Sequence, residues 1–178
     1  MFILYALVAG IAIGALLGGR LERLESLRLR WIWLALAGLV VQLVLFSPLM
    51  PGALAQSAGP ALYVASTVAA LAFVARNLRV PGLAIVALGA ASNLAVIVAN
   101  GGTMPASRAA LEAVGRAGIG GYANSRELAS PLLAPLGDVF ALPAWLPLAN
   151  VFSIGDVLIG IGIAILVAAA MRREPRPE

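Results

Sequence analysis

The sequence Gly-Asp-Val occurs twice near the C-terminus, at 137–139 and 155–157. Two carboxylates that lie close together can share one proton, so that one acts as a base while the other acts as an acid. The prolines between the two segments permit the chain to fold back, which would bring Asp138 and Asp156 together. They are the candidate catalytic residues, and the corresponding function is a membrane hydrolase or transferase on one face of the bilayer.

Each aspartate also has a structural interpretation. Ser153 and Asp156 have the spacing of a helix N-cap and its N3 residue, and an acid there also faces the positive end of the helix dipole. This pattern favours helix capping over catalysis. Asp138 is compatible with a turn or cap, or with an ion pair to one of three arginines: Arg108, Arg116 or Arg126.

The composition excludes much chemistry. The chain has no Cys and no His, and all 12 of its basic residues are Arg. Thiolate and imidazole nucleophiles and ligands are therefore absent, and no metal site is expected. Without Lys there is no Schiff-base chemistry. The sequence does not identify a cofactor, and it indicates no nucleic-acid partner.

The elements that must position the aspartates are apolar. Hydrophobic residues make up 62% of the chain and charged residues 11%, whereas a soluble domain has about 45–50% and about 25%. A spanning helix needs about 20 apolar residues. The sequence predicts one all-α polytopic membrane domain, residues 1–178, with five transmembrane helices at about 2–19, 31–49, 60–76, 81–99 and 152–171.

The arginines predict the orientation of these helices. Five spans place nine of them on one side, and the positive-inside rule makes that side cytoplasmic. The N-terminus is then outside and the C-terminus cytoplasmic, in a bacterial inner membrane. No basic residue precedes the first apolar run, which argues against a cleaved signal peptide. The nine residues are Arg20, Arg23, Arg28, Arg30, Arg76, Arg79, Arg172, Arg173 and Arg176.

Small residues recur every fourth position in four of the spans, which indicates close helix packing. The first span carries Gly10, Gly14 and Gly18, and the others have alanine or glycine stripes at 61–69, 87–99 and 160–168. Packing within the chain is the favoured interpretation, and homo-oligomerisation through the glycine face is the alternative. The connection after the first span has leucines at helical spacing, so that helix is expected to continue along the membrane surface. No ionisable residue lies mid-span, which makes a channel or carrier the weaker function.

The long connection at 100–151 is predicted to form an extracytoplasmic cap. It contains a sharp turn at 100–105, a short surface helix at 107–117, and a possible capping box at 124–127. Residues 128–148 are apolar but interrupted by prolines, so we expect them to lie at the outer interface or to re-enter the membrane. The turn is compatible with a helix C-cap or with a backbone nest for an anion such as a lipid phosphate, and the C-cap is favoured.

Three motifs occur here in order: Asn-Gly-Gly-x-Met-Pro at 100–105, Leu-Gly-Asp at 136–138, and Asn-Val-Phe-Ser-Ile-Gly-Asp at 150–156. With them, essentially the whole chain resembles the bacterial membrane-protein family catalogued as domain of unknown function 5317. The resemblance implies no known activity, and it places both aspartates in characteristic motifs. The remaining motif residues are the candidate binding residues: Asn100, Gly101, Gly102, Met104, Pro105, Asn150, Ser153 and Gly155.

The expected function is therefore non-catalytic. The outer face would bind membrane lipids, a hydrophobic small molecule or a partner subunit. The hydrolase or transferase using the two aspartates is the alternative.

Overall fold

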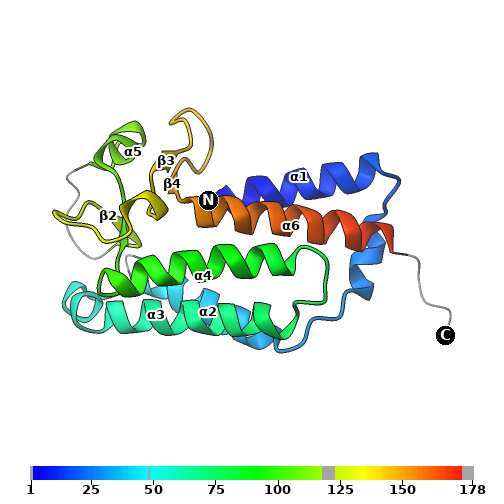
Figure 1. The fold of residues 1–178 in the computed structure, drawn as a ribbon, viewed down its shortest axis with the longest axis horizontal. Helices are drawn as coiled ribbons and strands as arrows, with labels where there is room; N and C mark the ends of the chain where they lie inside the picture. The colour runs from blue at the N-terminus through cyan, green and yellow to red at the C-terminus, as the bar shows by residue number, and fades with distance from the viewer. Residues whose placement is uncertain (1, 48, 118–122, 174–178) are drawn as a thin grey trace.

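The computed structural model describes residues 2–47, 49–117 and 123–173, and within them the chain is mostly helical. Five long helices lie side by side along the molecule (Figure 1). They are α1 (Phe2–Leu16), α2 (Ile32–Leu45), α3 (Gly52–Arg76), α4 (Leu83–Ala99) and α6 (Ile154–Arg172). The short helices are η1 (Leu21–Ser26), α5 (Arg108–Ala113) and η2 (Ala134–Leu136).

The long helices pack in the order α1, α6, α4, α3, α2. Small residues allow the backbones to approach closely at these contacts. A Cβ on Gly10 would lie 2.8 Å from the Cα of Ala164, and one on Gly38 would lie 2.9 Å from the carbonyl oxygen of Ser66. Because α6 has α1 on one side and α4 on the other, Asp156 in its first turn belongs to a helix with a neighbour on both sides.

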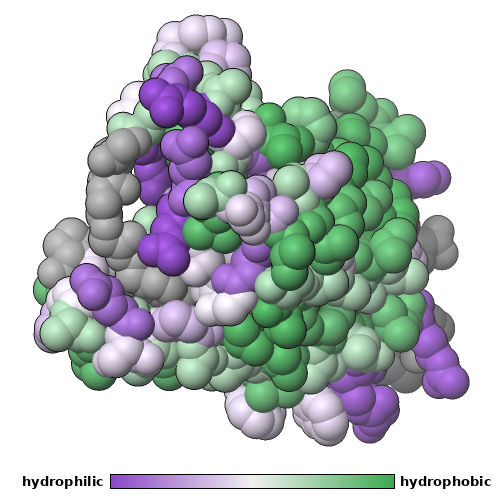
Figure 2. Space-filling model, turned by 60° about the vertical axis from the view of Figure 1, so that its left-hand side comes forward, coloured by the Kyte–Doolittle hydropathy of each residue, from purple (hydrophilic) through white to green (hydrophobic). Residues whose placement is uncertain are grey.

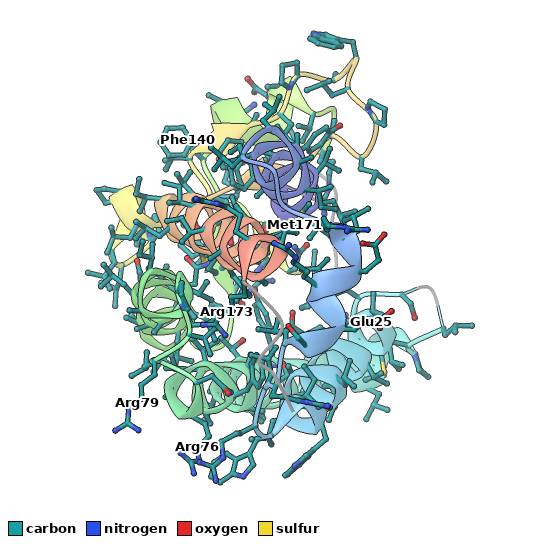
Figure 3. All side chains as sticks on the ribbon, turned by 90° about the vertical axis from the view of Figure 1, so that its right-hand side faces the viewer. Glu25, Arg76, Arg79, Phe140, Met171 and Arg173 are labelled. Atoms are coloured by element: carbon teal, nitrogen blue, oxygen red, sulfur yellow. The ribbon has the colours of Figure 1, made fainter. Side chains whose placement is uncertain are left out.

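The two ends of the bundle differ in charge. At one end, which we call the arginine end, the connections between the helices and the end of α6 carry eight of the nine arginines expected on one side. Arg76, Arg79 and Arg173 are seen there in Figure 3. Arg176 lies outside the described residues. At the opposite end, the aspartate end, the 100–151 segment covers the start of α6 and the end of α4 (Figure 1).

The 100–151 segment contains short β-ladders as well as helix. Strand β1 (Met104–Pro105) pairs in parallel with β2 (Ser125–Arg126), and β3 (Phe140–Ala141) pairs antiparallel with β4 (Val151–Phe152). The capping box expected at 124–127 is wrong, because residues 125–126 form a strand. The expected short surface helix is confirmed as α5, with Ser107 as its N-cap.

The bundle has a small core and a large apolar exterior. The main cluster of buried side chains joins α3 to α4 through Phe73, Val74, Leu83 and Val86. Large apolar side chains are nevertheless exposed along α1 and α2, and Figure 2 shows a continuous apolar surface over the helices. Polar residues gather on the 100–151 segment. Helices α3 and α6 are long and apolar enough to span a membrane, whereas α1, α2 and α4 are shorter apolar helices.

The helix bounds depart from the expectations at three places. Helix α2 ends at Leu45, although the span was expected to reach about residue 49. Helix α3 begins at Gly52 and runs through Pro60, although the span was expected to begin at about residue 60. The first helix ends at Leu16 instead of continuing along the surface, because Gly18 adopts a φ of 76° and Gly19 packs against Met171. Its continuation is the separate 3₁₀ helix η1.

The small-residue stripes predicted the packing faces of only two helices. Those of α1 and α6 face each other, since Gly10 and Gly14 contact Ala164, Ala168 and Met171 of the same chain. The alanine stripes at 61–69 and 87–99 instead lie largely on the exposed sides of α3 and α4. Helix α4 instead packs against α6 through Gly89 and Val86, because its backbone lies closer to α6 at these positions.

Candidate functional site

Asp156 lies in the first turn of α6 and is held by the cap of that helix. The Ser153 hydroxyl accepts a hydrogen bond from the Asp156 amide at 3.0 Å, and the Asp156 carboxylate accepts one from the Ser153 amide at 3.1 Å. This reciprocal pair is the capping box expected from the local sequence. Ser153 is fully buried, so the cap is part of the interior of the protein.

Asn93 of α4 connects this cap to a second helix. Its amide nitrogen donates to the Asp156 carboxylate at 2.9 Å, and its amide oxygen accepts from the Ser153 hydroxyl at 2.8 Å. The contact requires glycine at 155, because a Cβ there would collide with Asn93 and would lie 2.8 Å from the carbonyl oxygen of Gly89. Asn93, Ser153 and Asp156 therefore form one hydrogen-bonded unit between α4 and α6.

Asp138 lies in the 100–151 segment and is 4% exposed. Its amide donates to the Pro105 carbonyl at 2.8 Å, and its own carbonyl accepts from the Ser107 amide at 3.0 Å. The Ser125 hydroxyl donates a hydrogen bond to the carboxylate. Three separate parts of the segment thus meet at Asp138.

Burial raises the pKa of Asp138 to about 7, and desolvation is the main cause. The negative charge of Asp156 raises this pKa further, whereas the Ser125 hydrogen bond and the charge of Arg116 lower it. Sharing of a proton between the two aspartates stays a prediction. Their carboxylates have different hydrogen-bond partners, Ser125 for Asp138 and the Asn93–Ser153 unit for Asp156.

Two of the three arginines considered as ion-pair partners of Asp138 bind other side chains. Arg108 forms an ion pair with Glu112 at 2.8 Å, which raises the pKa of the guanidinium above its ordinary value. Arg116 donates to the side-chain oxygen of Asn150 at 2.8 Å. Arg126 lies in β2, the strand that pairs with β1. The Arg116 side chain thus connects Asn150 to the part of the 100–151 segment that follows α5.

The turn after α4 attaches the 100–151 segment to the bundle. The Asn100 side chain accepts from the Leu132 amide and donates to the Leu132 carbonyl, both at 2.9 Å. Gly101 and Gly102 have φ values of 64° and 84°, and the Gly102 amide donates to the Ile97 carbonyl at 2.8 Å. These features are those of a glycine C-cap. Binding of an anion by this turn remains a prediction.

The other motif residues are packing elements. Met104 is buried against Val96 and Ile97 of α4. Pro105 lies in β1, and a Cβ on Gly137 would lie 2.5 Å from the Pro105 carbonyl oxygen. Among the side chains that the structure describes, every buried nitrogen or oxygen has a hydrogen-bond partner.

The three motifs at the aspartate end all lie within the part of the chain that matches one protein family. The model of the family of unknown function DUF5317 matches residues 26–168. The chain belongs to this family. No curated protein and no solved structure matches it. Membership in DUF5317 assigns no activity.

The geometry gives each of the three motifs a structural role in this chain. The 100–105 turn holds Leu132, the 136–138 motif bridges to β1, and the 150–156 motif caps α6 and contacts α4. The sequence did not identify Ser125 as the partner of Asp138. No local signal in the sequence links Ser125 or Asn93 to an aspartate so far along the chain.

Proposed function

We propose that this chain is a five-span protein of the bacterial inner membrane, with α1, α2, α3, α4 and α6 crossing the bilayer. The uncharged sequence at 2–19, 32–75, 80–107 and 157–171 supports this proposal, as do the exposed apolar side chains of α1 and α2. A helix of 15 residues such as α1 rises about 22 Å. It therefore needs its flanking apolar residues, or a thinner bilayer, to complete a crossing of about 30 Å.

The charge distribution supports one orientation. The eight described arginines of the arginine end favour that end as cytoplasmic, by the positive-inside rule. The 100–151 segment is then an extracytoplasmic cap. The N-terminus of α1 is outside, and the C-terminal end of α6 is inside.

The proposed function of the cap is non-catalytic binding of an apolar molecule at the outer face. The observation that carries it is a group of exposed apolar side chains on a fixed backbone. Trp145 is 80% exposed, and Leu132, Phe140 and Leu148 are exposed in the same segment. Tyr5 donates to the Pro147 carbonyl at 2.6 Å, which holds this segment beside the first turns of α1.

The segment therefore lies level with the outer end of a spanning helix, where aromatic residues meet lipid headgroups. An apolar surface held rigidly at this depth fits a lipid, a hydrophobic small molecule or the membrane-facing part of a partner subunit. A partner that used the Gly10 and Gly14 face would have to replace α6, which occupies that face within the chain. Lipid is thus the occupant that we propose for the cap.

Tryptophan fluorescence tests this function. Replacing Trp31 and Trp33 with Phe leaves Trp145 as the single tryptophan. In vesicles of brominated phosphatidylcholine, we expect strong quenching when the bromines are close to the headgroup and weaker quenching when they are near the acyl-chain ends. Trp145 emission that is insensitive to bromine at either depth would contradict outer-face lipid contact. The Trp145→Phe variant, which keeps Trp31 and Trp33, is the control for quenching at the other interface.

A second candidate function is hydrolysis or group transfer by the aspartates. It is favoured by the pKa of about 7 at Asp138, since a group that titrates near neutral pH can act as an acid or a base. The test is to incubate the protein with bacterial lipid extract and to look for new products by mass spectrometry. Products formed by the native protein but not by the Asp138→Asn variant would establish catalysis, and their absence would leave the binding function.

A further inference from the structure

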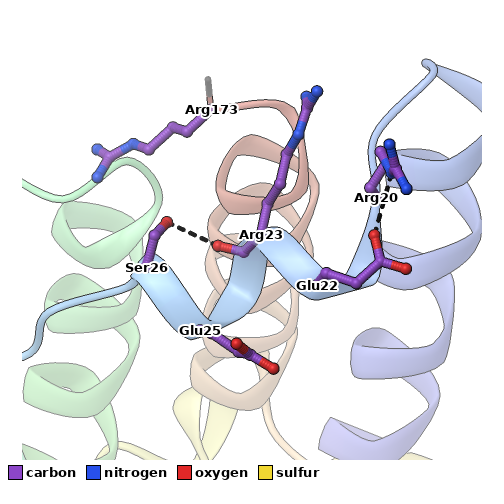
Figure 4. Close-up of a pocket in the computed structure, with 6 residues that line it drawn as sticks. All are labelled: Arg20, Glu22, Arg23, Glu25, Ser26 and Arg173. Carbon is purple, nitrogen blue, oxygen red and sulfur yellow. Dashed lines mark hydrogen bonds and ion pairs between the residues drawn. The ribbon is translucent and has the colours of Figure 1, made fainter. Parts of the chain in front are cut away.

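The arginine end contains a cavity of about 430 Å³ that the functions above do not use. It lies between η1 and the C-terminal end of α6 (Figure 4). Its lining is almost entirely charged and consists of Arg20, Glu22, Arg23, Glu25, Ser26 and Arg173. This volume is within the range of small-molecule sites, about 300–1,000 Å³.

The backbone around this cavity is fixed to α6. The Arg20 amide donates to the Met171 carbonyl at 2.9 Å, and the Arg23 guanidinium reaches the Arg172 carbonyl at 3.5 Å. The Ser26 hydroxyl donates to the Arg23 carbonyl at 2.7 Å. The arginines are therefore presented by a connection that is attached to the bundle at several points.

The charges within the cavity are separated. Glu22 forms an ion pair with Arg20 at 3.0 Å. The Arg23 and Arg173 side chains extend on one side of η1, whereas the Glu25 carboxylate lies on the other side (Figure 4). Two guanidinium groups thus extend, in different directions, on the side of η1 away from the Glu25 carboxylate. A guanidinium matches the geometry of a phosphate with paired N–H donors.

Apolar side chains adjoin this cationic group along the chain. Leu16 is 86% exposed, and Leu17 and Leu21 are also exposed. A soluble anion would use only the arginines, whereas a phospholipid would also cover these leucines with its acyl chains. We propose that this cavity binds the phosphate of an anionic phospholipid in the cytoplasmic leaflet. The proposal rests on the membrane-spanning arrangement but not on binding at the cap.

The test measures lipid affinity in detergent by native mass spectrometry, with phosphatidylglycerol as the probe and phosphatidylcholine as the neutral reference. The site variant replaces three arginines of the cavity, as Arg20→Gln, Arg23→Gln and Arg173→Gln. The matched control replaces three arginines of the same end that do not line the cavity, as Arg28→Gln, Arg30→Gln and Arg79→Gln. Both variants lose the same charge.

We expect the site variant to bind phosphatidylglycerol at least about tenfold more weakly, because it loses direct hydrogen bonds between guanidinium groups and the phosphate, whereas the control loses only long-range attraction. The control should change by about twofold or less. Equal weakening of the two variants, or no weakening of the site variant, would overturn the proposal. If the site variant does not fold, the single variants Arg23→Gln and Arg28→Gln are compared by the same criterion.

Inorganic phosphate distinguishes a lipid from a soluble anion. We expect it to displace phosphatidylglycerol only at a large molar excess, and displacement at equal concentration would overturn the lipid assignment. Quenching of Trp145 should be the same in the site variant and in the native protein. If lipid does not contact the cap at Trp145, the arginine cavity can still be tested. If the cavity does not bind phosphatidylglycerol, lipid contact at the cap can still be tested.

Discussion

The segments around Asp138 and Asp156 share the tripeptide Gly-Asp-Val but place their carboxylates in different surroundings. Asp156 stands at N3 of a long helix, where the capping box and Asn93 supply hydrogen-bond donors. Asp138 lies between short strands, is nearly fully buried, and accepts a hydrogen bond from Ser125. Burial raises the pKa of Asp138 to about 7. A shared tripeptide therefore does not give a shared role, because the backbone around each carboxylate selects its partners.

The glycines of the two segments also differ in what they permit. Gly155 allows α6 to approach the backbone of α4, so it serves contact between long helices. Gly137 allows the loop before Asp138 to approach the Pro105 carbonyl within the 100–151 segment. Gly155 supports the bundle, and Gly137 supports the 100–151 segment. Substitutions of these glycines and of the aspartates that follow them should separate the two roles.

The largest effect is expected for the pH dependence of stability. The pKa of Asp138 is about 7 in the folded protein, compared with an ordinary value of 3.8. Between these values the unfolded chain has released the proton that the folded protein retains, so stability falls as the pH rises through this window and is level above it. At 1.36 kcal/mol per pKa unit, the loss is at most about 4 kcal/mol.

The Asp138→Asn variant should abolish this slope and unfold at a higher temperature than the native protein above pH 7. Thermal unfolding in detergent from pH 4 to pH 8 measures it. The Asp156→Asn variant is the control and should retain most of the slope. A slope that survives Asp138→Asn would show that another group is responsible.

Truncation of Asp156 should cause the next largest effect. Asp156→Ala removes the capping box and leaves the Asn93 amide and the Ser153 amide without their acceptor. Loss of a helix N-cap costs about 1 kcal/mol, and a buried donor without a partner costs about 1–3 kcal/mol. We expect a total loss of about 2–3 kcal/mol in unfolding free energy. Asp156→Asn keeps one carbonyl acceptor and should lose less, so equal losses would argue against these hydrogen bonds.

The two glycine substitutions should differ in the part of the molecule that they loosen. Gly155→Ala should destabilise the bundle by about 2 kcal/mol through overpacking between helices, and the unfolding temperature should fall. Gly137→Ala should mainly loosen the 100–151 segment, which trypsin would detect as faster cleavage after Arg116 or Arg126. If Gly137→Ala lowers the unfolding temperature as much as Gly155→Ala does, the cap and the bundle unfold as one unit.

The smallest effect concerns Ser125. Ser125→Ala should cost about 1 kcal/mol, as expected for one hydrogen bond. It should also move the pKa of Asp138 further upward, since the hydroxyl hydrogen bond lowers that pKa. Carbon-13 NMR of the Asp138 carboxyl measures the midpoint directly. Ser125→Thr keeps the hydroxyl and should leave the midpoint near its native value, while an unchanged midpoint in Ser125→Ala would contradict the assigned bond.

The sequence by itself determined the features that depend on neighbours along the chain. Apolar runs and their arginine flanks predicted where the long helices lie, and the bounds differ mainly at α3, which continues through Pro60. The capping box of Asp156 was predictable because Ser153 is three residues away. The glycine faces of α1 and α6 were found for the same reason, since helical spacing alone defines a face.

Only the tertiary structure decided which distant groups meet. Ser125 and Asp138 are separated by 13 residues, Asn100 and Leu132 by 32, and Asn93 and Asp156 by 63. No periodic pattern links such pairs, because their contact depends on how the 100–151 segment folds back and on how α4 is rotated against α6. That rotation also left the alanine stripes of α3 and α4 largely exposed, because a row of small residues permits close packing but does not select the neighbour.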